Sequence, residues 1–96
     1  MTPQQALLDA VAYIEKHGWV QLNPLRGSPL GGCAINAITY VTHDWDSRDG
    51  AQDLLKKELG LEGPSLHDVY AWNDAPGQTK ENVLATMRRA AGVPSA

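Results

Sequence analysis

The sequence lacks features that mark several large classes of protein. It has no phenylalanine, so three tryptophans and three tyrosines supply all its aromatic volume. It has one cysteine, Cys33, which excludes an internal disulfide and gives no sign of an oxidising compartment. Residues 1–18 have no basic start and no unbroken apolar run, so they predict neither a signal peptide nor a membrane span. We therefore expect a cytoplasmic protein.

Positive charge is scarce and scattered along the chain. Eight lysines and arginines stand against 11 carboxylates, for a formal net charge of −3. No basic stripe is present that could neutralise several phosphates of a nucleic acid. Direct contact with nucleic acid is therefore disfavoured, and we expect the partner to be a host protein or a further copy of this chain.

Motifs for metals and phosphates are missing as well. The acidic segment HDWDSRDG has the wrong spacing for a calcium loop that starts at Asp44, because Arg48 would stand at a ligand position and Asp49 at the glycine position. One cysteine and dispersed histidines give no zinc spacing, and Gly31-Gly32 lacks the Lys and Ser or Thr of a phosphate loop. The sequence predicts no metal and no cofactor.

Apolar residues at helical spacing predict a mainly α protein. A chain of 96 residues is long enough for one core, so we expect a single compact domain over residues 1–96 with four or five helices. The prolines and glycines of residues 19–32 exclude a continuous helix and predict a loop-rich or short β-hairpin insert. The predicted helices span about residues 3–17, 33–42, 46–59, 66–72 and 80–91.

Capping residues support these boundaries. Thr2 precedes Pro3 and stands three residues before Gln5, a capping-box pattern with proline at the first helical position. Thr79 is placed to cap the last helix. The third helix is expected to carry Ala51, Leu54, Leu55 and Glu58 along its inner row, and the last helix Val83, Leu84, Met87 and Ala90 or Ala91.

The segment YAWNDAPGQT, residues 70–79, gathers aromatic and polar side chains at one corner. A structural interpretation is open for each, because Asn73 and Asp74 would follow a short helix and could hold a loop as in an Asx-turn. A functional interpretation is that Trp72, Asn73 and Asp74, with Tyr70, form a binding patch of aromatic and polar groups. Trp19 is a further candidate for this patch.

Three blocks of the sequence resemble a family of small uncharacterised proteins common in actinobacteria and their phages. These are a G-W-x-Q element at Gly18, a C-A-I-x-A-I segment at Cys33 and a W-N-D-x-P-G-x-T segment at Trp72. The resemblance spans nearly the whole chain and implies a phage or actinobacterial origin. It implies no reaction.

Cys33 allows an enzymatic alternative. It follows two glycines at the predicted start of a helix, where backbone N–H groups and the helix dipole would lower the pKa of a thiol. A thiol-dependent hydrolase or transferase would need His67 or His43 as base, with Asp74 to orient it. We favour a structural role, because a small apolar side chain beside Ala34 is ordinary core.

The catalytic sets are incomplete, whereas aromatic residues lie beside the predicted loops. Trp19, Trp45, Tyr70 and Trp72 are expected to stay partly exposed. The sequence therefore predicts a non-enzymatic accessory protein that acts by contact with another protein. A homo-oligomer whose helix faces are the partner surfaces is a further hypothesis.

Overall fold

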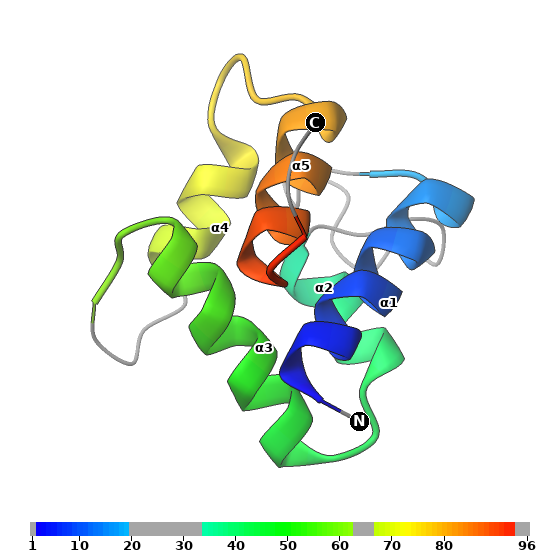
Figure 1. Ribbon diagram of the computed structural model, residues 1–96. Coiled ribbons are helices and arrows are strands. Elements are labelled where there is room, and N and C mark those ends of the chain that lie inside the picture. Colours follow the sequence, from blue (N-terminus) through cyan, green and yellow to red (C-terminus); the bar gives the residue numbers. More distant parts are fainter. Residues whose placement is uncertain (1, 20–33, 63–66, 94–96) are drawn as a thin grey trace.

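The computed structural model describes residues 2–19, 34–62 and 67–93. These residues form five α-helices, which confirms the predicted mainly α fold (Figure 1). Apart from Trp19, the predicted loop or hairpin insert at residues 19–32 lies outside the described residues. The helices are α1 (Pro3–His17), α2 (Ala34–Val41), α3 (Trp45–Glu58), α4 (His67–Asp74) and α5 (Lys80–Ala90).

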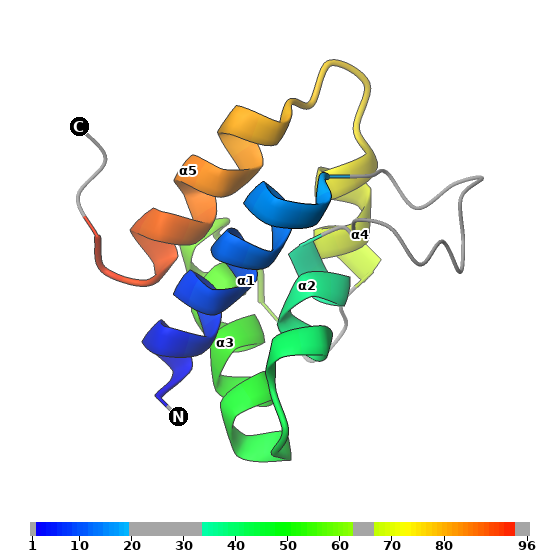
Figure 2. The same cartoon turned by 90° about the vertical axis from the view of Figure 1, so that its right-hand side faces the viewer.

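Helix α1 is the centre of the packing. It contacts α2, α3 and α5, and the view in Figure 2 shows it crossing in front of α3 with α5 and α2 on either side. Its buried residues recur every three or four positions, which gives one continuous apolar stripe. Two alanines in this stripe have small side chains, so neighbouring helices can approach closely. The stripe consists of Ala6, Leu7, Ala10, Val11 and Ile14.

Three helix starts are held by side-chain caps. Thr2 Oγ1 accepts a hydrogen bond from the Gln5 backbone N–H at 3.0 Å, and Thr79 Oγ1 accepts one from the Asn82 backbone N–H at 3.1 Å. Both caps were predicted from the sequence. Asp44 Oδ2 accepts from the backbone N–H of Ser47 at 2.8 Å, so α3 starts at Trp45, slightly earlier than expected.

The turn between α4 and α5 explains the Pro-Gly pair. Helix α4 runs on to Asp74, so Asn73 and Asp74 lie in its last turn and not after it, as the sequence had suggested. Pro76 and Gly77 then occupy the centre of a β-turn, closed by a 3.0 Å hydrogen bond from the Gln78 N–H to the Ala75 carbonyl. Gly77 has a φ of 83°, which a type II turn requires at this position and glycine adopts at little cost.

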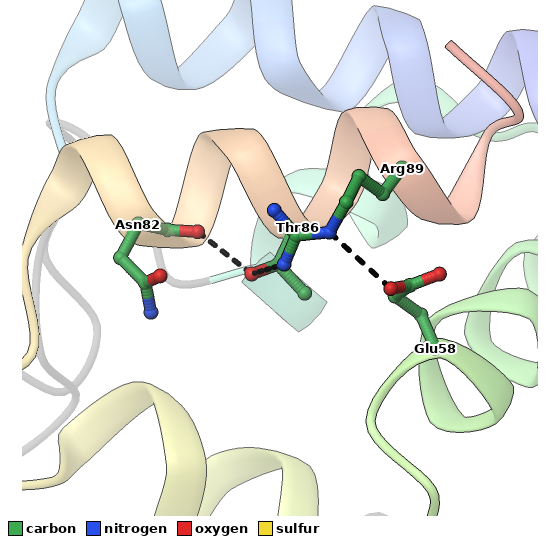
Figure 3. A network of polar contacts seen from close by, with 4 residues as sticks. All are labelled: Glu58, Asn82, Thr86 and Arg89. Atoms are coloured by element: carbon green, nitrogen blue, oxygen red, sulfur yellow. Dashed lines mark hydrogen bonds and ion pairs between the residues drawn. The ribbon is translucent and has the colours of Figure 1, made fainter. Parts of the chain in front are cut away.

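The prediction for the inner row of α3 is partly wrong. Ala51 and Leu55 are buried and Leu54 is half-buried, but Glu58 is exposed. Its carboxylate is 3.3 Å from Nε of Arg89, which extends from α5 and also donates to Thr86 Oγ1 at 3.1 Å (Figure 3). Glu58 therefore stays at the rim of the α3–α5 contact, where water and the guanidinium both solvate its charge.

Candidate functional site

A single buried amide joins three segments that are distant in sequence. The Asn73 side chain is 1% exposed, and its Oδ1 accepts a 2.9 Å hydrogen bond from the indole Nε1–H of Trp19. The same oxygen accepts the backbone N–H of Ala34, at the start of α2, at 3.2 Å. Asn73 Nδ2 donates to Asp74 Oδ1 at 3.1 Å. The amide thus ties the end of α1 and the start of α2 to the last turn of α4.

This arrangement brings together part of the predicted binding patch. Trp19, Asn73 and Asp74 are joined directly, whereas Tyr70 and Trp72 are half-buried and pack against the core. The backbone carbonyl of Trp72 accepts a 2.9 Å hydrogen bond from Gln78 Nε2, which fastens the corner to the following turn. The contacts describe a structural joint. That the same corner also binds a partner stays a prediction.

The residues of the enzymatic alternative are not brought together in the described part of the chain. Cys33 lies outside it, and His43 and His67 are both exposed. Asp74, the proposed orienting group, accepts the hydrogen bond from Asn73. The thiol hypothesis stays a prediction.

The described residues contain neither a cluster of metal-ligating side chains nor a helix able to span a membrane. No group of three or more His, Cys, Asp or Glu side chains within residues 2–19, 34–62 and 67–93 could hold a metal ion. None of the helices in these ranges combines the length and the apolar character that crossing a bilayer requires.

The most exposed aromatic side chain is Trp45, at the first residue of α3. It is 72% exposed, and the guanidinium carbon of Arg48 lies 4.6 Å from its ring centroid, a cation–π distance. Arg48 Nε also donates to Thr42 Oγ1 at 3.4 Å. Thr42 is buried and its hydroxyl donates to the Ile38 carbonyl at 2.7 Å. Contacts that begin in the core therefore hold Arg48 against one face of the indole.

A second exposed aromatic group joins α1 and α2. Tyr40 is 58% exposed and stacks on Tyr13 with ring centroids 5.3 Å apart and an interplanar angle of 12°. Tyr13 in turn contacts the ring of His17 at 4.6 Å. Tyr40 was not among the binding residues predicted from the sequence. The signal was present, because Tyr40 falls opposite the apolar row of its helix, which contains Ala34, Ile38 and Val41.

Carboxylates dominate the outer side of α3. Asp46, Asp49 and Asp53 are all exposed, and within the described residues no salt bridge joins any of them to a cation. Asp44, just before the helix, has a pKa below its ordinary value of 3.8, because the backbone N–H and then the side chain of Ser47 hydrogen-bond its carboxylate. The beginning of α3 is thus negative and carries an exposed indole.

The far end of α3 borders a shallow hollow. It has a volume of about 320 Å³ and is lined by both apolar and charged groups. One of these, Lys56, is only 6% exposed. The lining residues are Asp53, Leu54, Lys56, Lys57 and Leu61. Two lysines and one aspartate line this small space, so charges of both signs lie side by side in the hollow.

Comparison with known proteins gives a family but no function. A family model described as a family of unknown function (DUF6197) matches residues 1–93, and the chain therefore belongs to that family. This agrees with the resemblance to an uncharacterised family noted from the sequence. No curated protein and no solved structure matches the chain.

Proposed function

Starting from membership in a family of unknown function, we propose that the protein is a small non-enzymatic accessory factor that acts by contact with another protein. The observation that carries the proposal is the 72% exposed indole of Trp45, held in place by Arg48. Tryptophan, tyrosine and arginine are the residue types that contribute most to protein–protein binding energy. An exposed tryptophan adds little to the stability of the core, so binding is the better explanation for it.

The Trp45 side chain is also prepared for contact. Arg48 restricts the ring from one side, and Arg48 is itself held by the buried Thr42. A side chain that is ordered before binding loses less conformational entropy when the partner arrives. The other face of the indole is left for the partner. Tyr40, ordered by its stack on Tyr13, supplies a second ring of the same kind on α2.

The proposal includes the biological setting suggested by the sequence. The three motif blocks at Gly18, Cys33 and Trp72 resemble proteins of actinobacteria and their phages. We therefore place the protein in the cytoplasm of an actinobacterial cell, encoded by the bacterium or by a phage. Its partner there is a host protein, with a second copy of the chain as the other candidate.

Affinity capture tests the proposal. Tagged wild type, Trp45→Ala and the double variant Trp72→Ala, Asp74→Ala are each incubated with lysate of an actinobacterial host, and the retained proteins are quantified by mass spectrometry. We expect a discrete protein retained by wild type and reduced at least tenfold by Trp45→Ala, because a tryptophan hot spot contributes about 2 kcal/mol or more.

The double variant is the control for the corner. It removes Trp72 and Asp74, and its effect on capture decides between the two candidate surfaces. Retention unchanged in the double variant and lost in Trp45→Ala supports the Trp45 surface. Retention lost only in the double variant, with thermal unfolding as in wild type, assigns the contact to the corner. If all three samples retain the same proteins, neither surface is used and the proposal is wrong.

A further inference from the structure

The outer side of α3 has the chemistry to choose a particular kind of partner. We propose that Trp45, Asp46, Asp49 and Asp53, called here the acidic face, form the docking surface for a positively charged helical segment of a protein partner. The inference rests on the proposed contact function and adds the charge and shape of what is bound.

The acidic face is opposite the buried side of the same helix. Asp46, Asp49 and Asp53 are spaced three and four residues apart, so they form one row, and Trp45 begins the same side. Ser47, Ala51 and Leu55, which are buried, recur at the same spacing on the inner side. Figure 1 shows α3 along the outside of the helical assembly, with α1 and α5 on its inner side.

Contacts within the chain do not account for this row. Asp46 is in the first turn of α3, where the helix dipole favours a carboxylate, but Asp49 and Asp53 lie beyond that turn. Asp49 and Asp53 are also four residues apart, a spacing at which like charges on a helix repel. The two interhelical salt bridges among the described residues use Glu15 and Glu58 and none of these aspartates. The row is therefore exposed negative charge that no salt bridge among the described residues neutralises.

Charge complementarity selects the partner. A row of exposed carboxylates attracts lysine and arginine and repels nucleic acid and anionic membrane surfaces. From Asp46 to Asp53 the helix rises about 10 Å, which is the distance covered by basic residues at positions i, i+3 and i+7 of a second helix. The open face of the Trp45 indole at one end can take an apolar side chain or a cation. At the other end of the helix, the acidic face stops before Lys56, which is buried.

Titration with a defined peptide tests the inference. The probe is a synthetic amphipathic helix of lysine and leucine, and the same helix with glutamate in place of lysine is the negative control. The ¹⁵N-labelled protein is titrated at low salt and followed by NMR. We expect saturable shifts confined to residues 45–53 and the Trp45 indole, and these shifts should weaken as salt increases.

Two triple variants separate docking from general charge attraction. Asp46→Asn, Asp49→Asn, Asp53→Asn removes the row, while Glu62→Gln, Asp68→Asn, Glu81→Gln removes the same charge from exposed sites elsewhere. Thermal unfolding checks that both remain folded. We expect the first to bind the lysine peptide about tenfold more weakly, as three exposed ion pairs would give, and the second to bind as wild type does.

Equal weakening in both triple variants, or shifts spread over the whole surface, would overturn the inference. So would the absence of any saturable shift with the lysine peptide. These outcomes do not decide the proposed function, because that proposal is tested by the capture of a cellular protein through Trp45. A protein captured through Trp45 but retained fully by the first triple variant would refute the acidic face alone.

Discussion

Asn73 and Trp45 show how differently a polar and an apolar side chain can be used in the same small protein. The amide of Asn73 is buried and its Oδ1 accepts from both Trp19 and the backbone of Ala34. The indole of Trp45 is turned to solvent. Ordinary hydrophobic partitioning would reverse the two positions. Hydrogen bonds explain the buried amide, and within the described residues the exposed indole has the cation–π contact with Arg48.

Removal of the Asn73 amide should destabilise the fold. In Asn73→Ala, the Trp19 indole N–H and the Ala34 backbone N–H both lose their acceptor, and a buried donor left without one costs about 1–3 kcal/mol. The free energy of unfolding, measured by urea denaturation, should decrease by that amount. As a matched control, Asn82→Ala removes an exposed amide and should change the free energy by about 0.5 kcal/mol or less.

A charged replacement tests the amide more finely. In the wild type, Asn73 Nδ2 donates to the Asp74 carboxylate at 3.1 Å. Asn73→Asp keeps an acceptor oxygen but puts a second negative charge in place of this donor. This variant should be less stable than wild type at pH 7 and recover as the pH falls and a carboxyl becomes protonated. If Asn73→Asp and Asn73→Ala both have wild-type stability, the amide is not a structural joint.

Asp44 gives the stability of α3 a defined pH dependence. Its pKa in the folded protein is below its ordinary value of 3.8, so the cap stabilises the fold fully above that pH. The contribution should be lost as the pH falls through the lowered pKa of the folded state. We expect Asp44→Ala to have a lower melting temperature than wild type at pH 7. In strong acid, the two melting temperatures should become nearly equal.

Asparagine at this position provides the control. Asp44→Asn keeps an N-cap oxygen but has no charge to titrate, and asparagine is as good an N-cap as aspartate. Its difference in stability from Asp44→Ala should therefore be independent of pH. A constant difference between wild type and Asp44→Ala from neutral to strongly acidic pH would contradict the assigned cap.

At the scale of helices, local signals predicted most helix boundaries well. Boundaries that depend on contacts between residues distant in sequence were predicted less well. Thr2 and Thr79 were identified as caps because capping depends on residues three positions apart. The end of α4 was placed too early, because Asn73 is held in the helix by Trp19, a residue 54 positions away in sequence. All three motif blocks of the sequence meet at this amide, through Trp19, Ala34 and Asn73, but their spacing could not reveal that contact.

The acidic face was not predicted from the sequence, although the segment HDWDSRDG was considered as a calcium loop. The sequence predicted a helix from about residue 46, and α3 begins at Trp45 with Asp46 in its first turn. The helix start did not explain Asp49. Exposure of Trp45 was predicted from its place beside a loop, but the position of Arg48 over its ring depends on the side-chain contact with Thr42.

The contact between α1 and α3 requires a residue without a side chain. A Cβ added to Gly50 would lie 2.6 Å from Cγ of Pro3, well inside van der Waals contact. Gly50→Ala should therefore reduce stability by about 1–3 kcal/mol through overpacking, although alanine is the better helix former by about 1 kcal/mol. Urea denaturation of the single variants measures the effect.

The double variant Gly50→Ala, Pro3→Ala serves as the control. It removes the Cγ at 2.6 Å and keeps the Cβ at 3.1 Å, so the cost of Gly50→Ala should be smaller in the Pro3→Ala background. Equal costs in the two backgrounds would mean that the α1–α3 contact adapts without strain.

At the scale of the whole molecule, the five helices of the described residues build one core around α1 and leave the outer side of α3 exposed. The core explains the apolar residues, the caps and the buried amide. Packing of the core does not explain why an ordered tryptophan, Trp45, lies exposed on the same side of α3 as three aspartates. The contact function and the acidic face are proposed to account for that remainder.

Photo-crosslinking from position 45 tests the central claim most directly. Trp45 is replaced by benzoylphenylalanine, the protein is expressed in an actinobacterial host, and ultraviolet light joins the ring to whatever lies against it. The control places the same residue at Glu81, an exposed position in the first turn of α5. The account predicts a discrete adduct from position 45, absent from position 81, whose crosslinked peptide is rich in lysine and arginine. Adducts of equal yield from both positions, or none from position 45, would contradict it.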